Sequence, residues 1–112
     1  MLHELLALWT PQGIERCGVI VGGNEIVELE NIHPAPAEAF AMDIDGLENI
    51  TATWHTHPRS SANLSKTDHG SFKCYPEFSH YIVSNQNVWC YKIHNNEVIF
   101  DHDDSHITRL SS

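Results

Sequence analysis

The chain has 112 residues, enough for one hydrophobic core but not for two, so we expect a single domain over residues 1–112. Hydrophobic residues make up 41% of the chain and charged residues 19%, near globular averages, which excludes an intrinsically disordered chain. Fifteen acidic residues against six basic ones give a formal net charge of −9, which argues against nucleic acid and anionic membrane surfaces as partners.

The first predicted elements are a short amphipathic helix and a β-hairpin. Leucines and a tryptophan recur at helical spacing within Met1–Trp9, and the turn residues Thr10–Gly13 interrupt them. Cys17–Val21 is rich in β-forming residues and is closed by Gly22–Asn24, and apolar residues resume over Ile26–Ile32. We therefore expect the first two strands to be antiparallel neighbours.

The middle of the chain predicts a loop, a strand and a second helix. Prolines make His33–Pro36 a loop, whereas residues 40–50 fit a short strand and a short helix equally well. Thr51–His57 is rich in β-branched and aromatic residues and ends at Pro58, so it predicts a strand that runs into a loop. The segment Ser65–Cys74 opens with a helix-start signature.

The last third predicts an antiparallel meander. Three strand-like runs, Phe78–Val83, Val88–His94 and Val98–Asp101, are separated by polar turn residues. The polar tail His102–Ser112 is expected to fray, which leaves a core of about residues 15–100. The predicted fold class is α/β, with a curved mixed or largely antiparallel sheet, the first helix on one face and the second helix beside the candidate site.

Two histidines at the end of the third predicted strand form a candidate metal site. Residues i and i+2 of a strand point to the same face, so His55 and His57 can present two imidazoles together. A catalytic zinc ion takes three protein ligands and keeps an open position for water. Asp68, at the junction between loop and helix, is the candidate third ligand of one catalytic Zn²⁺.

Hydrolysis also needs a proton carrier and a donor for the developing oxyanion. A carboxylate outside the metal's own ligands can take a proton from water and return it to the leaving amine, and Glu15, just before the first strand, is the candidate. The hydroxyl of Ser65, three residues before Asp68, is the candidate oxyanion donor. Together these roles describe the hydrolysis of an amide bond.

The same residues carry a family resemblance. His55-Thr56-His57-Pro58, with seven residues between His57 and Ser65 and two between Ser65 and Asp68, resembles the signature of the JAMM (MPN-plus) zinc metalloproteases. The segment Glu15–Gly22 is similar to that family's first strand, in which a glutamate precedes a Cys-Gly pair and an apolar run. The resemblance implies a JAMM/MPN fold with a cytidine-deaminase-like architecture and a peptide or isopeptide hydrolase.

A narrower resemblance points to short phage and bacterial members. Asn31–Pro36 and Phe40–Asp43 are similar to segments of such members, notably the amino-terminal part of tail-assembly protein K of lambda-like phages. This implies a protein substrate, with a ubiquitin-like partner processed during tail assembly, and a location in the host cytoplasm or the virion. The chain has no room for the insertions by which eukaryotic members grip ubiquitin chains.

Each candidate residue also has a structural interpretation. His55 and His57 fit half-buried strand histidines, Ser65 and Asp68 fit a capping-box helix start, and Glu15 fits a solvated acid before a strand. His-x-His alone favours the structural interpretation, and the full spacing reverses that preference. The rival function is a non-catalytic assembly or scaffold module, because many proteins of the wider MPN fold lack the metal ligands.

Other histidines and the cysteines predict no further chemistry. We expect His69 on the surface rather than at a second metal site, and we treat the histidines without ligand spacing as ordinary: His33, His80, His94, His102 and His106. The three cysteines, Cys17, Cys74 and Cys90, include no CxxC pair, so neither a disulfide framework nor a zinc ribbon is indicated. Cys17 and Cys90 are expected to pack as small hydrophobes and Trp54 and Trp89 to lie in or around the core.

The sequence also predicts a cytoplasmic protein. Its apolar runs are too short to span a bilayer, and its amino terminus carries no basic leader.

Overall fold

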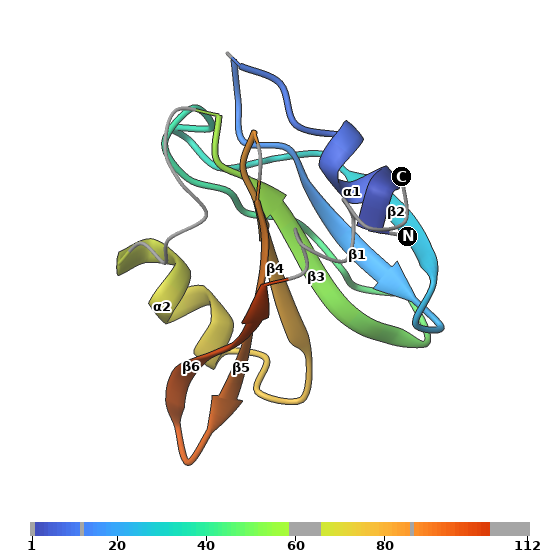
Figure 1. The fold of residues 1–112 in the computed structure, drawn as a ribbon, viewed down its shortest axis with the longest axis vertical. Helices are drawn as coiled ribbons and strands as arrows, with labels where there is room; N and C mark the ends of the chain where they lie inside the picture. The colour runs from blue at the N-terminus through green and yellow to red at the C-terminus, as the bar shows by residue number, and fades with distance from the viewer. Residues whose placement is uncertain (1, 12, 59–65, 86, 104–112) are drawn as a thin grey trace.

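A computed structural model describes residues 2–11, 13–58, 66–85 and 87–103 of the chain. Its elements in chain order are α1 (Leu2–Ala7), β1 (Cys17–Val21), β2 (Glu25–Leu29), β3 (Ile50–Thr56), α2 (Lys66–Lys73), β4 (Ser79–Val83), β5 (Val88–His94) and β6 (Glu97–Asp103). The strands form one mixed sheet of six strands in the order β2-β1-β3-β4-β5-β6 (Figure 1). Strands β3 and β4 run parallel, and the other neighbouring pairs are antiparallel. Neither described helix is long and apolar enough to cross a membrane.

The predicted hairpin and meander are both confirmed. Strand β1 pairs with β2, and β4, β5 and β6 follow one another as antiparallel neighbours. The undecided segment is neither helix nor strand over residues 40–49; it is irregular, with one turn at residues 45–46, and leads into β3. The predicted end of the last strand was wrong, because β6 continues to Asp103 and pairs His102 with Cys90. Residues 104–112 of the predicted tail lie outside the described part of the chain, and the single-domain boundaries stay a prediction.

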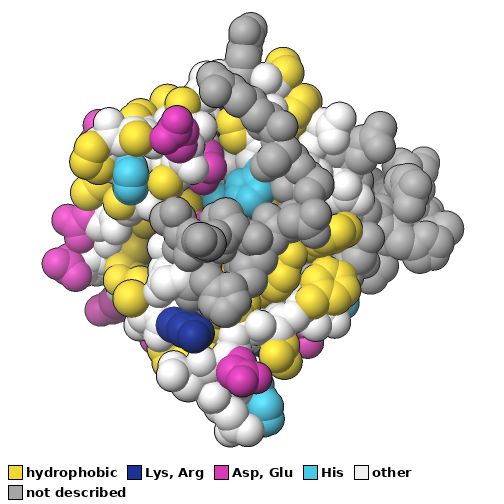
Figure 2. Space-filling view, turned by 90° about the vertical axis from the view of Figure 1, so that its left-hand side faces the viewer, with side chains coloured by type: hydrophobic (Ala, Val, Ile, Leu, Met, Phe, Trp, Pro, Cys, Tyr) yellow, Lys and Arg dark blue, Asp and Glu magenta, His cyan; other side chains and the backbone are white. Residues whose placement is uncertain are grey.

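Helix α2 lies against one face of the sheet, on the side that Figure 2 turns toward the viewer. Phe72 of α2 packs there with Ile82 of β4 and Tyr91 of β5. Stacking of the Phe72 ring on His80, with centroids 4.3 Å apart, joins this cluster to the parallel pair β3–β4. The helix is thereby fixed beside the end of β3, where the candidate histidines lie.

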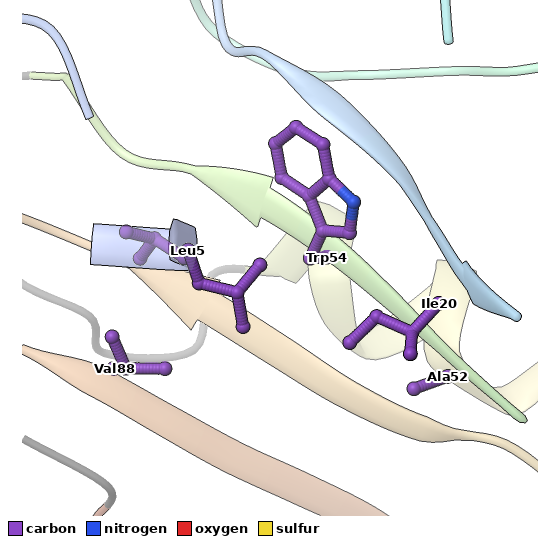
Figure 3. Close-up of a cluster of buried hydrophobic side chains, with 6 residues drawn as sticks. Leu5, Ile20, Ala52, Trp54 and Val88 are labelled. Atoms are coloured by element: carbon purple, nitrogen blue, oxygen red, sulfur yellow. The ribbon is translucent and has the colours of Figure 1, made fainter. Parts of the chain in front are cut away.

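Helix α1 packs against the opposite face of the sheet. Leu5 of α1 belongs to a buried cluster with side chains from β1, β3, β4 and β5, and Figure 3 labels most of its members: Leu5, Ile20, Ala52, Trp54 and Val88. Trp54 is fully buried there. Side chains alternate along a strand, so Ala52 and Trp54 point toward α1 and their neighbours Thr53 and His55 point toward α2. The hydrophobic alternation of β3 therefore directs His55 to the α2 face.

Gly18 allows β1 to pass closely under the core tryptophan. A Cβ atom at this position would lie 2.0 Å from the carbonyl oxygen of Val27 and 2.8 Å from the ring of Trp54. Neither neighbour can retreat easily, since one is backbone of the paired strand and the other is fully buried. The Cys-Gly pair that marks the first strand in the sequence thus has a packing role.

We expect Gly18→Ala to lower the free energy of unfolding by about 3 kcal/mol, because the added methyl forces β1 away from β2 and Trp54. Gly70→Ala is the matched control, since no atom lies within 4 Å of a Cβ built there. Alanine in the helix should raise stability by up to about 1 kcal/mol. Urea denaturation of both variants measures the difference, and equal effects would contradict the packing argument.

Candidate metal centre

The end of β3 places both histidines on one side of the sheet. His55 is the penultimate residue of β3 and fully buried, and His57 follows directly after the strand. Thr56, between them, is held the other way by two contacts with Arg16: its amide donates to the Arg16 carbonyl oxygen and its Oγ1 accepts from the Arg16 amide. The Nε2 atoms of His55 and His57 lie 3.1 Å apart.

Asp68 meets both imidazoles from the first turn of α2. Its Oδ1 lies 2.9 Å from Nε2 of His55, and its Oδ2 lies 3.1 Å from Nε2 of His57. Zinc bonds of about 2.0–2.1 Å in a tetrahedron place neighbouring ligand atoms roughly 3.3 Å apart. The three side chains predicted as ligands therefore lie together at spacings that fit one small divalent ion.

Glu15 faces the same group from the loop before β1. Its amide donates to the Pro36 carbonyl oxygen at 2.7 Å, and its own carbonyl oxygen accepts from Nδ2 of Asn31 at 2.8 Å. One carboxylate oxygen of Glu15 and a ring nitrogen from each of His55 and His57 all lie within 4.8 Å of one another.

Glu15 is only 7% exposed, and its Oε1 has no hydrogen-bond partner among the described residues. A buried carboxylate oxygen without a donor is costly, and a cation or its water would remove that cost. The solvated-acid interpretation of Glu15 does not fit this burial. At this distance Glu15 fits either a metal ligand or a proton carrier beside the metal.

The protonation states also suit a metal ion. Burial lowers the pKa of His55, so the imidazole is neutral at pH 7. Burial alone would raise the pKa of Asp68, but its contacts with His55 and His57 outweigh burial and hold that pKa well below its usual range. Those contacts keep Asp68 ionised at pH 7. A neutral imidazole and an ionised carboxylate are the forms that bind a metal ion.

Glu15 differs from Asp68 in its electrostatics. Burial raises the pKa of Glu15 to about 7, the charge of His57 opposes this rise and the charge of Asp68 reinforces it. Below pH about 4.5 the carboxyl is protonated in both the folded and the unfolded chain. Between pH about 4.5 and 7 the unfolded chain ionises Glu15 while the folded protein keeps it protonated, so stability falls across this window and levels off above pH 7.

In protein kept metal-free with a chelator, we therefore expect Glu15→Gln to gain about 3 kcal/mol relative to wild type between pH 4.5 and pH 8. The glutamine is neutral throughout, and the other titrating groups cancel in the difference. Urea denaturation of both proteins across this range measures it. A difference independent of pH would show that the pKa of Glu15 is not raised.

Aromatic side chains enclose His55 and fix its orientation. The ring of Phe40 stacks on His55 with centroids 4.2 Å apart, and Phe72 meets it edge-on at 5.9 Å. Nε1 of Trp9 donates to the carbonyl oxygen of His57 at 2.9 Å. Figure 2 shows histidine and acidic side chains close together on this face, bordered by hydrophobic ones. The sequence did not indicate these positioning contacts, because the three aromatic residues lie far apart along the chain.

The comparisons with known proteins agree with this geometry. The family model described as prokaryotic homologs of the JAB domain matches residues 5–98. The chain belongs to this family. The match spans Glu15, both histidines and Asp68, and it confirms the resemblance to JAMM/MPN domains. No match to a curated protein was found. The resemblance to tail-assembly protein K stays a prediction.

Other sequence predictions for this JAB domain have mixed outcomes. Cys17 and Cys90 are fully buried, as expected, and burial raises the pKa of the Cys17 thiol to about 11, which keeps it protonated and unreactive. Trp54 lies in the core as expected. Ser65 and His106 lie outside the described residues, as does the side chain of His69, so their roles stay predictions.

Two histidines treated as ordinary have structured surroundings in the JAB domain. His80 is 1% exposed and bonded to Thr53 and to the Tyr75 carbonyl oxygen. His102 lies with Cys90 and Asp101 in a second group whose ligand atoms fall within 4.8 Å of one another. Sequence spacing missed this group because the pairing of β5 with β6 brings it together. The ammonium of Lys92 lies 3.6 Å from Asp101 and disfavours a cation there.

Proposed function

We propose that this JAB domain is a zinc-dependent peptidase that hydrolyses a peptide or isopeptide bond. Family membership alone does not decide this, because JAB domains include both metalloproteases and inactive members. One observation carries the proposal: the buried carboxylate of Glu15 has no hydrogen-bond partner at Oε1 and lies beside the imidazoles of His55 and His57. Asp68 contacts the same two imidazoles from α2. An inactive scaffold has no need of a buried acid at that position.

His55, His57 and Asp68 are the proposed ligands. Asp68 contacts Nε2 of both histidines, and none of the three residues is more than 5% exposed, so the ion would be held in a buried site that keeps one position open for the reacting water. A bound zinc ion supplies Lewis-acid polarisation of the scissile carbonyl and lowers the pKa of water to about 7. The enclosing rings of Phe40 and Phe72 hold His55 in place, which keeps the ligand set preorganised.

Glu15 is the proposed proton carrier. Its carboxylate accepts a proton from the attacking water and then delivers it to the leaving nitrogen, so that the amine departs neutral. In the metal-free protein burial raises the pKa of Glu15 to about 7, and the charge of a bound zinc ion would lower it and so favour the carboxylate that accepts the proton. Ser65 completes the proposal as the hydroxyl that donates to the developing oxyanion.

The proposed substrate is a protein segment. The resemblance to short phage members extends the proposal to a ubiquitin-like partner that is processed in tail assembly. A search for a protein fragment that accumulates in cells only with active protein, and not with an inactive variant, tests this part separately from the chemistry.

The chemistry is tested with a mixture of unrelated peptides analysed by mass spectrometry. Protein purified without chelator should contain about one zinc per chain and cleave peptides, chelation should abolish cleavage, and zinc should restore it. Stoichiometric zinc with no cleavage of peptides or of isopeptide-linked proteins would favour the scaffold alternative. Cleavage that survives chelation would show that the hydrolysis does not need the proposed centre.

A further inference from the structure

A hollow adjoins the candidate metal centre on the α2 face of the sheet. It is a cavity of about 210 Å³ between the loop that precedes β3 and helix α2. The loop contributes Phe40, Met42 and Ile44 to its lining. Phe72 lines it from α2, and Tyr75 lines it from the turn that follows this helix. Its lining is therefore mainly apolar, although Met42 and Ile44 are half-buried and Tyr75 is exposed.

The cavity shares a wall with the metal centre. Phe40 and Phe72, which line it, are the two rings that contact His55. Thr53 also lines it, two residues before His55 on the same face of β3, which is about 7 Å along the strand. A peptide whose scissile bond reaches the centre can therefore place a neighbouring side chain in the cavity.

Two polar side chains of the cavity, Thr53 and His80, are already hydrogen-bonded. Thr53 Oγ1 donates to Nδ1 of His80 at 2.7 Å, and Nε2 of His80 donates to the Tyr75 carbonyl oxygen at 3.0 Å. Burial lowers the pKa of His80 to about 4, so the ring is neutral at pH 7. None of the described side chains that line the cavity carries a charge. A charged occupant would lose its hydration without a counter-charge, whereas an apolar occupant would leave the bonds of Thr53 and His80 intact.

The size of the cavity limits the occupant. A volume of about 210 Å³ is below the roughly 300–1,000 Å³ of sites that take whole small molecules. It corresponds to about seven waters at roughly 30 Å³ each, which is room for one large side chain. Alanine would leave most of this space unfilled.

We propose that this cavity binds one large aliphatic or aromatic side chain of the protein substrate, next to the scissile bond, and so determines specificity. The link to cleavage rests on the proposed peptidase function, but binding of the side chain does not. The two parts are therefore tested by different measurements.

Cys74 provides a binding assay that needs no catalysis. It lines the cavity and is exposed, whereas Cys17 and Cys90 are buried, so iodoacetamide should react at Cys74. N-acetyl-leucine amide or N-acetyl-phenylalanine amide at about 20 mM should slow this reaction at least about threefold. The alanine and aspartate amides should not slow it. Equal protection by all four amides, or by none, would overturn the proposal.

Two cavity variants and one control sharpen this assay. Ser71→Phe places a ring in the cavity and should remove protection by the leucine and phenylalanine amides. Should that variant fail to fold, Met42→Ala widens the cavity and should shift protection from leucine toward phenylalanine. Ile99→Ala trims an exposed apolar side chain on β6, away from the cavity, and should behave as wild type. Unchanged protection of Cys74 in both cavity variants would show that the amides bind outside the cavity.

Cleavage of the peptide mixture tests the role in specificity. Wild type should prefer leucine, methionine or phenylalanine over alanine at one position beside the cleaved bond by about tenfold or more. Met42→Ala should change this preference and Ile99→Ala should not. Cleavage without such a preference would overturn the specificity role. Protection of Cys74 without any cleavage would instead support binding of the side chain in the cavity and contradict the proposed peptidase function.

Discussion

Glu15→Gln should lower kcat of peptide hydrolysis by about 100-fold to 10,000-fold while the protein keeps its zinc. Glutamine has the shape of glutamate but cannot accept the proton from water or return it to the leaving nitrogen. The site itself should survive, because the main chain of Glu15 is held by Pro36 and Asn31 rather than by its carboxylate. Zinc content by mass spectrometry and kcat on one cleaved peptide measure the two properties separately.

The matched control is Glu30→Gln, which makes the same change at an exposed glutamate after β2 and should leave kcat unchanged. The closeness of Glu15 to His55 and His57 gives the experiment a second use. Loss of zinc in Glu15→Gln would make Glu15 a ligand instead of a proton carrier. Full activity of Glu15→Gln with zinc retained would show that another residue accepts the proton.

Asp68→Ala should weaken zinc binding by more than about 100-fold and abolish hydrolysis. Replacing residues that only support metal ligands already costs about 10-fold to 100-fold in affinity, so loss of a ligand should cost more. Asp68 is also the only one of the three proposed ligands that carries a charge, and its removal leaves two imidazoles with 3.1 Å between their Nε2 atoms and no anion beside them. Competition with a chromophoric chelator measures the affinity.

Asp45→Ala is the control for this variant, since Asp45 is an exposed acid in the loop before β3. It makes the same change in net charge and should bind zinc as wild type does. Zinc binding of equal strength in Asp68→Ala and wild type would show that Asp68 is not a ligand. In that case the helix-capping interpretation of the sequence would be the better account of Asp68.

Much of this arrangement was predictable because it follows local rules. The alternation of β3 and the two-residue spacing of His55 and His57 fix a shared face, and the turn residues Gly22–Asn24 fix the β1–β2 hairpin. The family spacing pointed to Asp68 and Glu15, and the structure brings both to the histidines. Their chemical roles remain predictions for the variants above.

The rest depends on contacts between distant segments. Phe40 lies in a segment without regular structure, so no periodicity marks its stacking on His55. The burial of His80 follows from the parallel pairing of β3 with β4, which adjacent sequence does not specify. The extension of β6 past Asp101 depends on an irregularity in its register with β5, and a polar sequence gives no sign of it.

The hydrogen-bond register between β1 and β3 determines how Glu15 and the two histidines are placed relative to one another. Cys17 lies opposite His55, the Thr56 amide donates to the Arg16 carbonyl oxygen, and the Arg16 amide donates to Oγ1 of Thr56. The pairing of the two strands therefore sets the position of Glu15 relative to the imidazoles. Inserting one residue into either strand would move the side chains beyond the insertion to the opposite face of the sheet, and Glu15 would no longer lie beside His55 and His57. A shift in the alignment of β1 with β3 would therefore separate Glu15 from the histidines even if every residue of the site were kept.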